Sequence, residues 1–344
     1  MRAMGFNRHG GADVMEIIEV DDPAPSDNEV MIRLIGTSVN RLDILAREGV
    51  HGMPMSMPHI PGTDIIGTIE KTGKAVKGFS EGETVISNTV YGCGSCDKCR
   101  AGEENLCAQW KCVGLQVDGS YGEMVCVPER LLSRPPKAYP NSELAAMPHS
   151  LPVAWRALHT LGKAREGESV LIRGASGNTG IFSVMLAKAM GLRIIAMSRS
   201  RQKAQRLKSL GAGHVLDTNA AQETIREEVM SITNGRGADI VLETSGSTLG
   251  DSVGLSAYSA RIVVFGTIQG PVSEIIIKRL YLWNACITGT HNASKKEFDE
   301  AFGFASRNGI RPIIAATMPI EEAANAQRAL EQSRHFGKIV LKHW

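Results

Sequence analysis

The sequence predicts an α/β protein in which a doubly wound parallel sheet is joined to a β-rich domain. With 344 residues the chain is long enough for two domains, since one domain usually takes about 100 to 200 residues. From residue 169 onward, strand-like segments alternate with helical ones, which is typical of a parallel sheet with helices on both faces. Before residue 150, short β-rich segments are separated by Gly and Pro. We therefore expect domains over residues 1–150 and 151–290, with residues 291–344 returning to the first domain.

The expected elements follow from the spacing of apolar residues. In the first domain the β-rich segments are RAMGF, VMEIIEV, EVMIRLIGTSV, DIIGTIEKTG and GETVISN, and only residues 41–47 have the pattern of a short helix. In the second domain, helices are expected over residues 178–190, 201–210 and 220–233, between the strands SVLIR, RIIAMS, HVL, DIVLE and RIVVFG. After about residue 290 the pattern indicates helices and one strand, KIVLKHW.

The composition excludes several classes of partner. The formal net charge is +2 and 43% of the residues are hydrophobic, so the chain has neither the polybasic surface of a nucleic-acid binder nor a disordered composition. No apolar run approaches the roughly 20 residues that cross a bilayer, and the first residues lack the apolar core of a signal peptide. We expect a cytoplasmic homo-oligomer, a dimer or a tetramer, that acts on a small molecule and binds neither nucleic acid nor a membrane.

A glycine-rich turn indicates a dinucleotide site. The strand SVLIR leads directly into GASGNTG and then into an apolar helix, so Ala175, Gly177 and Gly180 occupy an A-x-G-x-x-G form of the phosphate-binding turn, with Asn178 and Thr179 between the glycines. Glycine lets the backbone approach a pyrophosphate, and the start of the helix supplies free N–H groups and the positive end of its dipole. An ordinary tight turn of a doubly wound sheet is the alternative.

The next strand favours NADP(H) over NAD(H). An NAD site usually carries Asp or Glu about 20 residues after the turn, where the carboxylate binds the ribose diol. Here no carboxylate occurs from residue 169 through residue 216, whereas Ser198, Arg199 and Lys203 follow the strand RIIAMS. Cations and hydroxyls suit a 2′-phosphate. A solvated basic helix face is the alternative.

Four of the seven cysteines fall within fifteen residues and predict a zinc site. The spacing C-x2-C-x2-C-x7-C supplies four thiolates on a Gly-rich loop over about residues 91–112, which closes a tetrahedral shell and leaves no position for water. A ferredoxin-type cluster would require Cys-Pro where Glu103 and Glu104 stand. We therefore expect one structural zinc ion per chain, held by Cys93, Cys96, Cys99 and Cys107.

Taken together, the four-cysteine lobe, PGTDIIGTI before it and GKIVL near the end resemble the medium-chain dehydrogenase/reductase family, with the zinc alcohol dehydrogenases as the nearest branch. The resemblance covers essentially the whole chain. It implies a GroES-like catalytic domain interrupted by a Rossmann domain, with the active site in the cleft between them.

The chain departs from that family at the positions that hold a second, catalytic zinc. The first ligand cysteine corresponds to Asn40, and the His-Glu pair corresponds to Thr63 and Asp64. The third ligand position carries His149, and Leu42 replaces the hydroxyl residue that relays the alcohol proton. One imidazole, one amide and one hydroxyl make a poor zinc shell, so we expect no catalytic zinc.

In these respects the chain resembles the zinc-free quinone oxidoreductases and enoyl reductases of the same superfamily, which carry similar V-N-x-x-D and P-G-x-D-x-x-G patterns. The resemblance implies that Arg41 and Lys338 lie near the cofactor phosphates and that the nicotinamide rests against Gly266, Thr267 and the CITGT strand. For Arg41 and Lys338, an ordinary surface cation is the alternative.

Hydride transfer to a carbonyl or an activated alkene builds negative charge on oxygen, which hydrogen-bond donors must stabilise where no metal does. Asn40 and Thr63 are the candidate donors, and His149 or His51 is the candidate proton source. The sequence thus favours an NADP(H)-dependent reductase of bulky ketones or aldehydes. An NADPH quinone or enoyl reductase and a non-enzymatic NADPH-binding protein are the alternatives.

Overall fold

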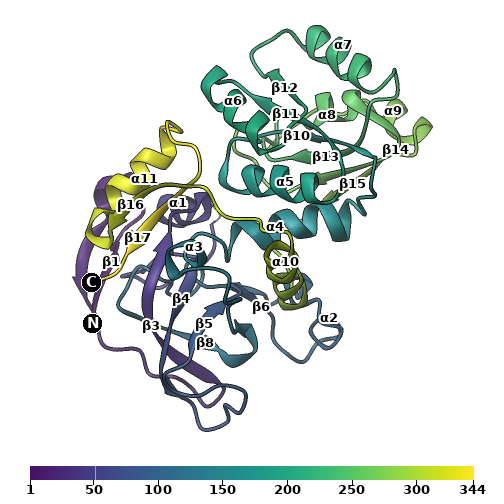
Figure 1. The fold of residues 1–344 in the computed structure, drawn as a ribbon. Helices are drawn as coiled ribbons and strands as arrows, with labels where there is room; N and C mark the ends of the chain where they lie inside the picture. Colours follow the sequence, from purple (N-terminus) through teal and green to yellow (C-terminus); the bar gives the residue numbers. More distant parts are fainter. Residues whose placement is uncertain (51) are drawn as a thin grey trace. The chain divides into compact units, whose positions relative to one another are not determined.

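The computed structural model describes residues 1–50 and 52–344. The chain forms two compact units (Figure 1). The first unit comprises Met1–Pro152, Ala293–Ser306 and Arg311–Trp344, and the second comprises Val153–Asn292 and Arg307–Ile310. No helix in the described part of the chain combines the length and the apolar character needed to cross a bilayer.

The second unit is built on a six-stranded sheet in the order β12-β11-β10-β13-β14-β15, and every pair in it is parallel. The order reverses direction between β10 and β13, as in a doubly wound sheet, and the carboxyl ends of all six strands share one edge. The strands are β10 (Ser169–Ile172), β11 (Arg193–Ser198), β12 (His214–Asp217), β13 (Ala238–Glu243), β14 (Ser256–Val264) and β15 (Cys286–Gly289).

Helices connect these strands. The three helices expected from the sequence are present as α5 (Asn178–Ala189), α6 (Arg201–Leu210) and α7 (Gln222–Ile232). Two further helices, α8 (Leu249–Leu255) and α9 (Ile277–Leu282), were not expected, and α9 buries none of its side chains. A π-helix, Arg156–Leu161, follows α4 (Ser150–Trp155).

The first unit contains a mainly antiparallel seven-stranded sheet in the order β16-β17-β3-β4-β5-β9, with β8 paired to β3. Two pairs of short strands, β1 with β2 and β6 with β7, accompany it. The strands are β1 (Arg2–Gly5), β2 (Glu16–Glu19), β3 (Glu29–Ser38), β4 (Ile65–Thr72), β5 (Thr84–Ser87), β6 (Val90–Tyr91), β7 (Lys111–Cys112), β8 (Met124–Pro128), β9 (Leu132–Ser133), β16 (Ile314–Pro319) and β17 (Lys338–Lys342).

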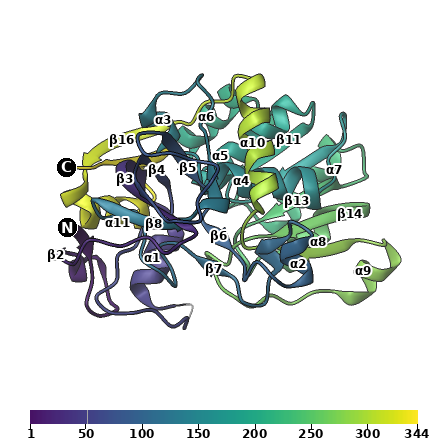
Figure 2. The ribbon, with the colours of Figure 1, turned by 90° about the horizontal axis from the view of Figure 1, so that it is seen from below.

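Two expectations for this unit need correction. The segment before residue 150 holds two short helices besides α1 (Arg41–Glu48), namely α2 (Asp97–Arg100) and α3 (Asn141–Leu144). The C-terminal segment contains α10 (Lys295–Arg307), α11 (Ala323–Glu331) and two strands rather than one, because β16 pairs in parallel with β17. Both ends of the chain lie together in this unit, and the Arg2 guanidinium lies 4.6 Å from the centre of the Trp344 ring (Figures 1 and 2).

Helix α1 is fixed at both ends. Asp43, the third residue of the helix, accepts the backbone N–H of Asn40 at 2.8 Å and so satisfies a donor at the helix start. The helix stops at Gly49, whose φ of 69° is left-handed and therefore favours glycine. Because β3 ends at Ser38, this cap places Asn40 directly between the longest strand of the sheet and the helix.

Candidate active site

Four cysteine side chains meet in the lobe between β6 and β7. In Figure 2, α2, which carries one of the four cysteines, lies in the segment that connects β6 to β7. The four sulfur atoms lie within 4.8 Å of one another, with Sγ of Cys93 4.0 Å from Cys99 and Sγ of Cys96 3.7 Å from Cys107. Four thiolates bound to zinc at about 2.3 Å have sulfurs separated by about 3.8 Å. The set therefore fits a tetrahedral zinc ion.

The backbone around the lobe is shaped for thiolates. A Cβ atom on Gly92 would lie 2.4 Å from Sγ of Cys99, so only glycine fits beside the cluster. The backbone N–H groups of Cys93 and Gln109 donate to Sγ of Cys107 at 3.4 and 3.3 Å. These two bonds lower the pKa of the Cys107 thiol and favour the form that binds metal.

The predicted dinucleotide turn joins β10 to α5 in the second unit. Gly174 has a φ of 68°, and a Cβ atom on Gly180 would lie 2.2 Å from its carbonyl oxygen. Helix α5 begins after Gly177, so Asn178 and Thr179 stand in its first turn. The turn thus places glycines at two crowded backbone positions beside the start of a helix, which is where phosphate groups bind in dinucleotide-binding sheets.

The residues predicted to select the cofactor lie at the end of β11. Ser198 is buried and its hydroxyl accepts the backbone N–H of Ser200, whose own side chain caps α6 by accepting the backbone N–H of Lys203 at 3.4 Å. Arg199 is exposed. Burial lowers the pKa of Lys203, and the positive charge of Arg199 lowers it further. Two cations that repel each other at the end of this strand favour an anion near them.

One acid near this position was not considered from the sequence. Asp217 ends β12 directly opposite Ser198 in the register of the two strands. Its Oδ1 accepts the backbone N–H and the side-chain amide of Asn219, at 2.9 and 3.1 Å. This carboxylate is therefore held by its own turn.

The segments predicted to contact the nicotinamide are neighbours in the second unit. Gly266 and Thr267 follow β14, and a Cβ atom on Gly266 would lie 2.8 Å from the carbonyl oxygen of Thr244 at the end of β13. The CITGT segment forms β15, whose Gly289 pairs with Val264 of β14. The structure therefore brings the glycine turn, the end of β11 and these segments to one edge of the parallel sheet, where doubly wound proteins bind their ligands.

In the first unit, Asn40 lies at the centre of a buried polar group. Its Oδ1 accepts a hydrogen bond from the Lys338 ammonium at 2.6 Å, and its Nδ2 donates to Asp64 at 2.7 Å and to Thr63 at 3.0 Å. Lys338 also lies 3.0 Å from the Asp64 carboxylate, and both side chains are almost completely buried. Burial alone would raise the pKa of Asp64, but the charge of Lys338 and several hydrogen bonds hold it below its ordinary value.

Two residues assigned to the cofactor phosphates therefore differ sharply in their surroundings. Lys338 is not a surface cation, because its ammonium is buried against Asn40 and Asp64. The assignment of Lys338 to the cofactor phosphates stays a prediction. Arg41 is exposed at the first position of α1, and its assignment stays a prediction.

Thr63 and Asp43 extend this group away from Lys338. The Thr63 hydroxyl donates to Oδ1 of Asp43 at 3.0 Å, and the Tyr121 hydroxyl donates to Oδ2 at 3.2 Å. Burial raises the pKa of Asp43 to about 7, although the backbone N–H of Asn40 opposes the shift. Asn40 and Thr63, predicted as free donors for a developing oxyanion, thus already donate to neighbouring groups.

Of the two candidate proton sources, the structure describes His149. His149 donates its backbone N–H to Asp64 at 2.7 Å, and its buried Nδ1 has no hydrogen-bond partner among the described residues. Burial lowers the pKa of His149 to about 4, so the ring is neutral at pH 7 and is a poor acid. The role of His149 as a proton source stays a prediction. His51 lies outside the described residues.

A catalytic zinc ion does not fit the residues around Asn40. Among the described residues, the four cysteines are the one group of three or more His, Cys, Asp or Glu side chains placed to hold a metal ion, and the amide and hydroxyl oxygens of Asn40 and Thr63 are weak zinc ligands. The nearby Asp64 carboxylate already binds the Lys338 ammonium, whose charge would repel a divalent ion. Leu42 packs against the apolar cluster of Val90, Cys112 and Leu115 and offers no hydroxyl for a proton relay.

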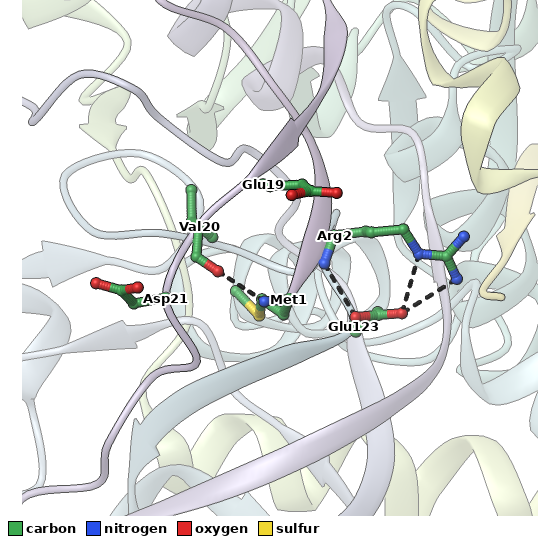
Figure 3. Close-up of a pocket in the computed structure, with 6 residues that line it drawn as sticks. All are labelled: Met1, Arg2, Glu19, Val20, Asp21 and Glu123. Carbon is green, nitrogen blue, oxygen red and sulfur yellow. Dashed lines mark hydrogen bonds and ion pairs between the residues drawn. The ribbon is translucent and has the colours of Figure 1, made fainter.

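An open hollow elsewhere in the first unit contains none of the predicted residues. It measures about 720 Å³ and lies beside the N-terminus, where Met1 donates to the carbonyl of Val20 and Arg2 pairs with Glu123 (Figure 3). Glu19 and Asp21 complete the lining.

Sequence reasoning missed two members of the Asn40 group. Asp43 stands in the V-N-x-x-D pattern, but only the contact with Thr63 shows that its carboxyl faces the site. Tyr121 is separated from Asp43 by 78 positions in the chain, and no local pattern links them.

Comparison with known proteins gives two family matches. Residues 26–137 match the model for the alcohol dehydrogenase GroES-like domain, and residues 179–307 match the zinc-binding dehydrogenase model. The two matches cover the β-rich part and the parallel-sheet part of the chain.

Relatives extend the match over nearly the whole length. An NAD-dependent alcohol dehydrogenase of Sulfolobus acidocaldarius is 30% identical over 99% of both chains. An acryloyl-coenzyme A reductase of Sulfurisphaera tokodaii is 28% identical over 94% of this chain and 95% of its own. A solved NAD-dependent alcohol dehydrogenase superposes with a TM-score of 0.91 at 32% identity, covering 99% of both chains. The predicted fold, a doubly wound Rossmann sheet inserted in a GroES-like domain, is confirmed.

The cysteine lobe generates a first prediction about metal content. We expect about one zinc ion per chain, because the four cysteines form a complete set of zinc ligands whereas the residues around Asn40 do not. Cys99→Ser should lose the metal and lower the melting temperature, since a closed thiolate site supports the fold. Elemental analysis and thermal unfolding measure both, with Cys126→Ala as the matched control outside the cluster. Two zinc ions per chain would contradict the hypothesis that the residues around Asn40 bind no zinc.

Proposed function

Because the chain belongs to the zinc-type alcohol dehydrogenases of the medium-chain dehydrogenase/reductase superfamily, we propose that it is an NADPH-dependent reductase of bulky ketones or aldehydes that works without a catalytic metal. The observation that carries the proposal is the buried contact of Lys338 with Asn40 and Asp64. An ammonium ion there supplies positive charge without a site for a divalent metal. In this proposal, residues 1–150 and 291–344 provide the catalytic domain and residues 151–290 the cofactor domain.

In this proposal, different residues bind the cofactor and the structural zinc. A bound nicotinamide would supply the hydride. The glycine turn of residues 174–180 would hold the pyrophosphate at the start of α5. Ser198, Arg199 and Lys203 would bind the 2′-phosphate, and Cys93, Cys96, Cys99 and Cys107 would hold one structural zinc.

A second candidate has a specific observation in its favour. The acryloyl-coenzyme A reductase relative aligns with 94% of this chain, and reduction of a conjugated alkene needs no alcohol proton relay. In that reaction the hydride goes to the β-carbon and the negative charge still develops on the carbonyl oxygen. The same donor group of the first unit therefore serves both candidates, and substrate tests must separate them.

The end of β11 generates a prediction about cofactor choice. NADPH should bind more tightly than NADH, because Arg199 and Lys203 can form charge-assisted hydrogen bonds with the 2′-phosphate, each contributing about 1.5–3 kcal/mol. Arg199→Asp should narrow or reverse this preference in fluorescence titrations of the two cofactors. Arg193→Asp, at the opposite end of the same strand, is the control and should keep it. Equal affinities in the unmodified protein would refute the assignment.

The proposed absence of a metal ion beside Asn40 leads to a prediction about substrates. Primary alcohols should be very poor substrates, since no metal lowers the pKa of a bound hydroxyl and Leu42 cannot carry its proton away. NADPH oxidation should be measurable with ketones, enones and quinones, and it should survive brief chelator treatment that leaves the cysteine-bound zinc in place. Rapid ethanol oxidation abolished by a chelator without unfolding would show a catalytic metal.

The second unit carries an apolar face that we assign to a second copy of the chain. The exposed fractions of its side chains exceed one half: Ile268 63%, Val272 77%, Ile276 73%, Ile277 63% and Tyr281 62%. These residues belong to the segment that leads from β14 to β15 in the chain, and β15 ends the sheet order and leaves one edge open to a strand. Two identical edges can pair about a twofold axis and cover both faces at once, so a homodimer is the occupant.

This assignment predicts the oligomeric state. Ile277→Asp should convert the dimer to a monomer in light-scattering measurements, because the pairing would bury an unpaired charge. Ile17→Asp, an exposed isoleucine of β2, is the control and should leave the dimer intact. A monomeric unmodified protein at micromolar concentration would overturn the assignment.

A further inference from the structure

We propose that the cysteine lobe is a metal-dependent anchor for α10, in which a zinc ion on the four thiolates restrains a short turn and the Glu104 carboxylate of that turn holds the start of the helix. The inference rests on the zinc site of the proposed function and does not depend on the proposed hydride chemistry. It gives the metal a task outside its own lobe, because zinc would then control how firmly α10 is fixed.

Helix α10 is the first helix of the first unit after the chain returns from the second unit. The long segment of the second unit ends at Asn292, and the first unit resumes at Ala293. Two residues later α10 begins, and it runs from Lys295 to Arg307 beside the lobe that carries α2 (Figure 1). The contacts at the start of α10 therefore determine where the returning chain is held.

The anchor is a hydrogen bond between two segments that are 191 positions apart in the chain. The Glu104 carboxylate accepts the backbone N–H of Lys295, the first residue of α10. This N–H is one of those at a helix start that have no partner within the helix, and a carboxylate there also interacts favourably with the helix dipole. Ser294 and Glu297 satisfy two further N–H groups, because the side chain of each accepts the backbone N–H of the other. Glu104 thus completes the capping of α10 from outside the helix.

Glu104 belongs to the same turn as one of the cysteines. The turn is the 3-10 helix Glu104–Leu106, and the backbone N–H of Cys107, directly after it, donates to the carbonyl of Glu104 at 3.1 Å. Cys107 is buried, and its Sγ lies 3.7 Å from Sγ of Cys96. A zinc ion bound to these sulfurs would restrain Cys107 and, three residues earlier in the same turn, Glu104.

Loss of the metal would release this turn. The four sulfur atoms lie within 4.8 Å of one another, so they repel each other as thiolates and form only weak hydrogen bonds as thiols. A turn that is no longer restrained presents Glu104 less often to α10, and the Lys295 N–H then bonds to water. We therefore expect the first turn of α10 to fray when zinc leaves.

The rest of α10 has contacts that do not involve the lobe. Asp299 accepts the Ser133 hydroxyl of β9 at 2.5 Å and forms an ion pair with the Lys295 ammonium, also at 2.5 Å. Phe298 and Phe302 are buried, and their ring centres lie 4.8 Å apart. The body of the helix should therefore stay folded without zinc, so that the response is confined to its start.

Stabilisation of the lobe alone is the rival explanation, since a bound zinc ion supports the loop that carries its ligands. This explanation predicts that zinc loss loosens residues 91–112 and nothing beyond them. It predicts no response of a distant helix that depends on one carboxylate. Removal of the Glu104 side chain separates the two explanations, because it breaks the contact with α10 and leaves all four cysteines in place.

The test measures amide hydrogen exchange over residues 293–299 of the full-length protein by mass spectrometry. The zinc-loaded protein is compared with two zinc-free forms, the unmodified protein after prolonged dialysis against a strong chelator and Cys99→Ser. Zinc loss should speed exchange at the start of α10 about tenfold, as expected for a lost capping interaction. Exchange in α6 of the second unit should stay unchanged and shows that the protein is folded. Equal exchange over residues 293–299 with and without zinc would overturn the anchor.

Variants of Glu104 test whether its carboxylate carries the effect. Glu104→Ala should exchange at the zinc-free rate while zinc is still bound, and zinc removal should then add nothing. Glu104→Gln should restore most of the protection, because its amide oxygen can still accept the Lys295 N–H. Asp97→Asn, an exposed carboxylate of the same lobe that pairs with Arg100, is the matched control and should keep the full response to zinc. A Glu104→Ala protein that still responds to zinc at α10 would overturn the anchor.

The contact with β9 supplies a comparison in the opposite sense. Ser133→Ala should speed exchange of α10 by the same factor with and without zinc, because the Asp299 contact does not involve the lobe. A Ser133→Ala effect that vanished on zinc removal would show that α10 responds to the metal by another route and would overturn the anchor.

Zinc affinity gives a second readout that needs neither cofactor nor substrate. Coupling between two sites is reciprocal, so Glu104→Ala should bind zinc about tenfold more weakly than the unmodified protein in competition with a coloured chelator. Equal affinities would overturn the anchor. A protein that binds no zinc would overturn the zinc assignment and the anchor together, whereas failure to reduce any carbonyl compound or enone would count against the proposed reaction alone.

Discussion

The buried ion pair of Lys338 with Asp64 is the constraint on which the first unit depends. Two charges out of water are tolerated only if their remaining hydrogen-bonding capacity is satisfied. Asp64 meets this condition with Ser38, Asn40, Lys338 and the backbone N–H of His149. These partners come from the end of β3, the start of α1, the start of β17 and the residue before α4, so one carboxylate fixes four separate segments.

The same pair determines what chemistry the site can perform. A lysine ammonium carries a single charge and three donors but no coordination position, so it polarises neighbours without activating a bound alcohol or water. Asn40 links this cation to Thr63, and Thr63 links it to Asp43. In the proposed reduction, which consumes a proton at the end, the proton would then have to come from a protein acid.

The sequence was sufficient for features that are encoded locally. Alternating strands and helices predicted the parallel sheet, α6 was placed with its exact bounds, and the cysteine spacing alone identified a group whose sulfurs do meet. The sequence did not predict the contact of Lys338 with Asn40, because the two residues are 298 positions apart in the chain. Their contact depends on the antiparallel pairing of β17 with β3, in which Val340 lies opposite Ser38, and no pattern within either strand specifies that pairing. For the same reason β16, which pairs only with β17, was missed.

The assignment of acid and base could not come from residue types, because burial reverses their usual order. An exposed aspartate releases its proton well below an exposed histidine. Here burial lowers the pKa of His149 to about 4 and raises that of Asp43 to about 7. Between those values the Asp43 carboxyl is protonated while the His149 imidazole is neutral. Because the pKa values of such groups are set by their burial and neighbours, the acid and the base of this group could not be assigned from residue types alone.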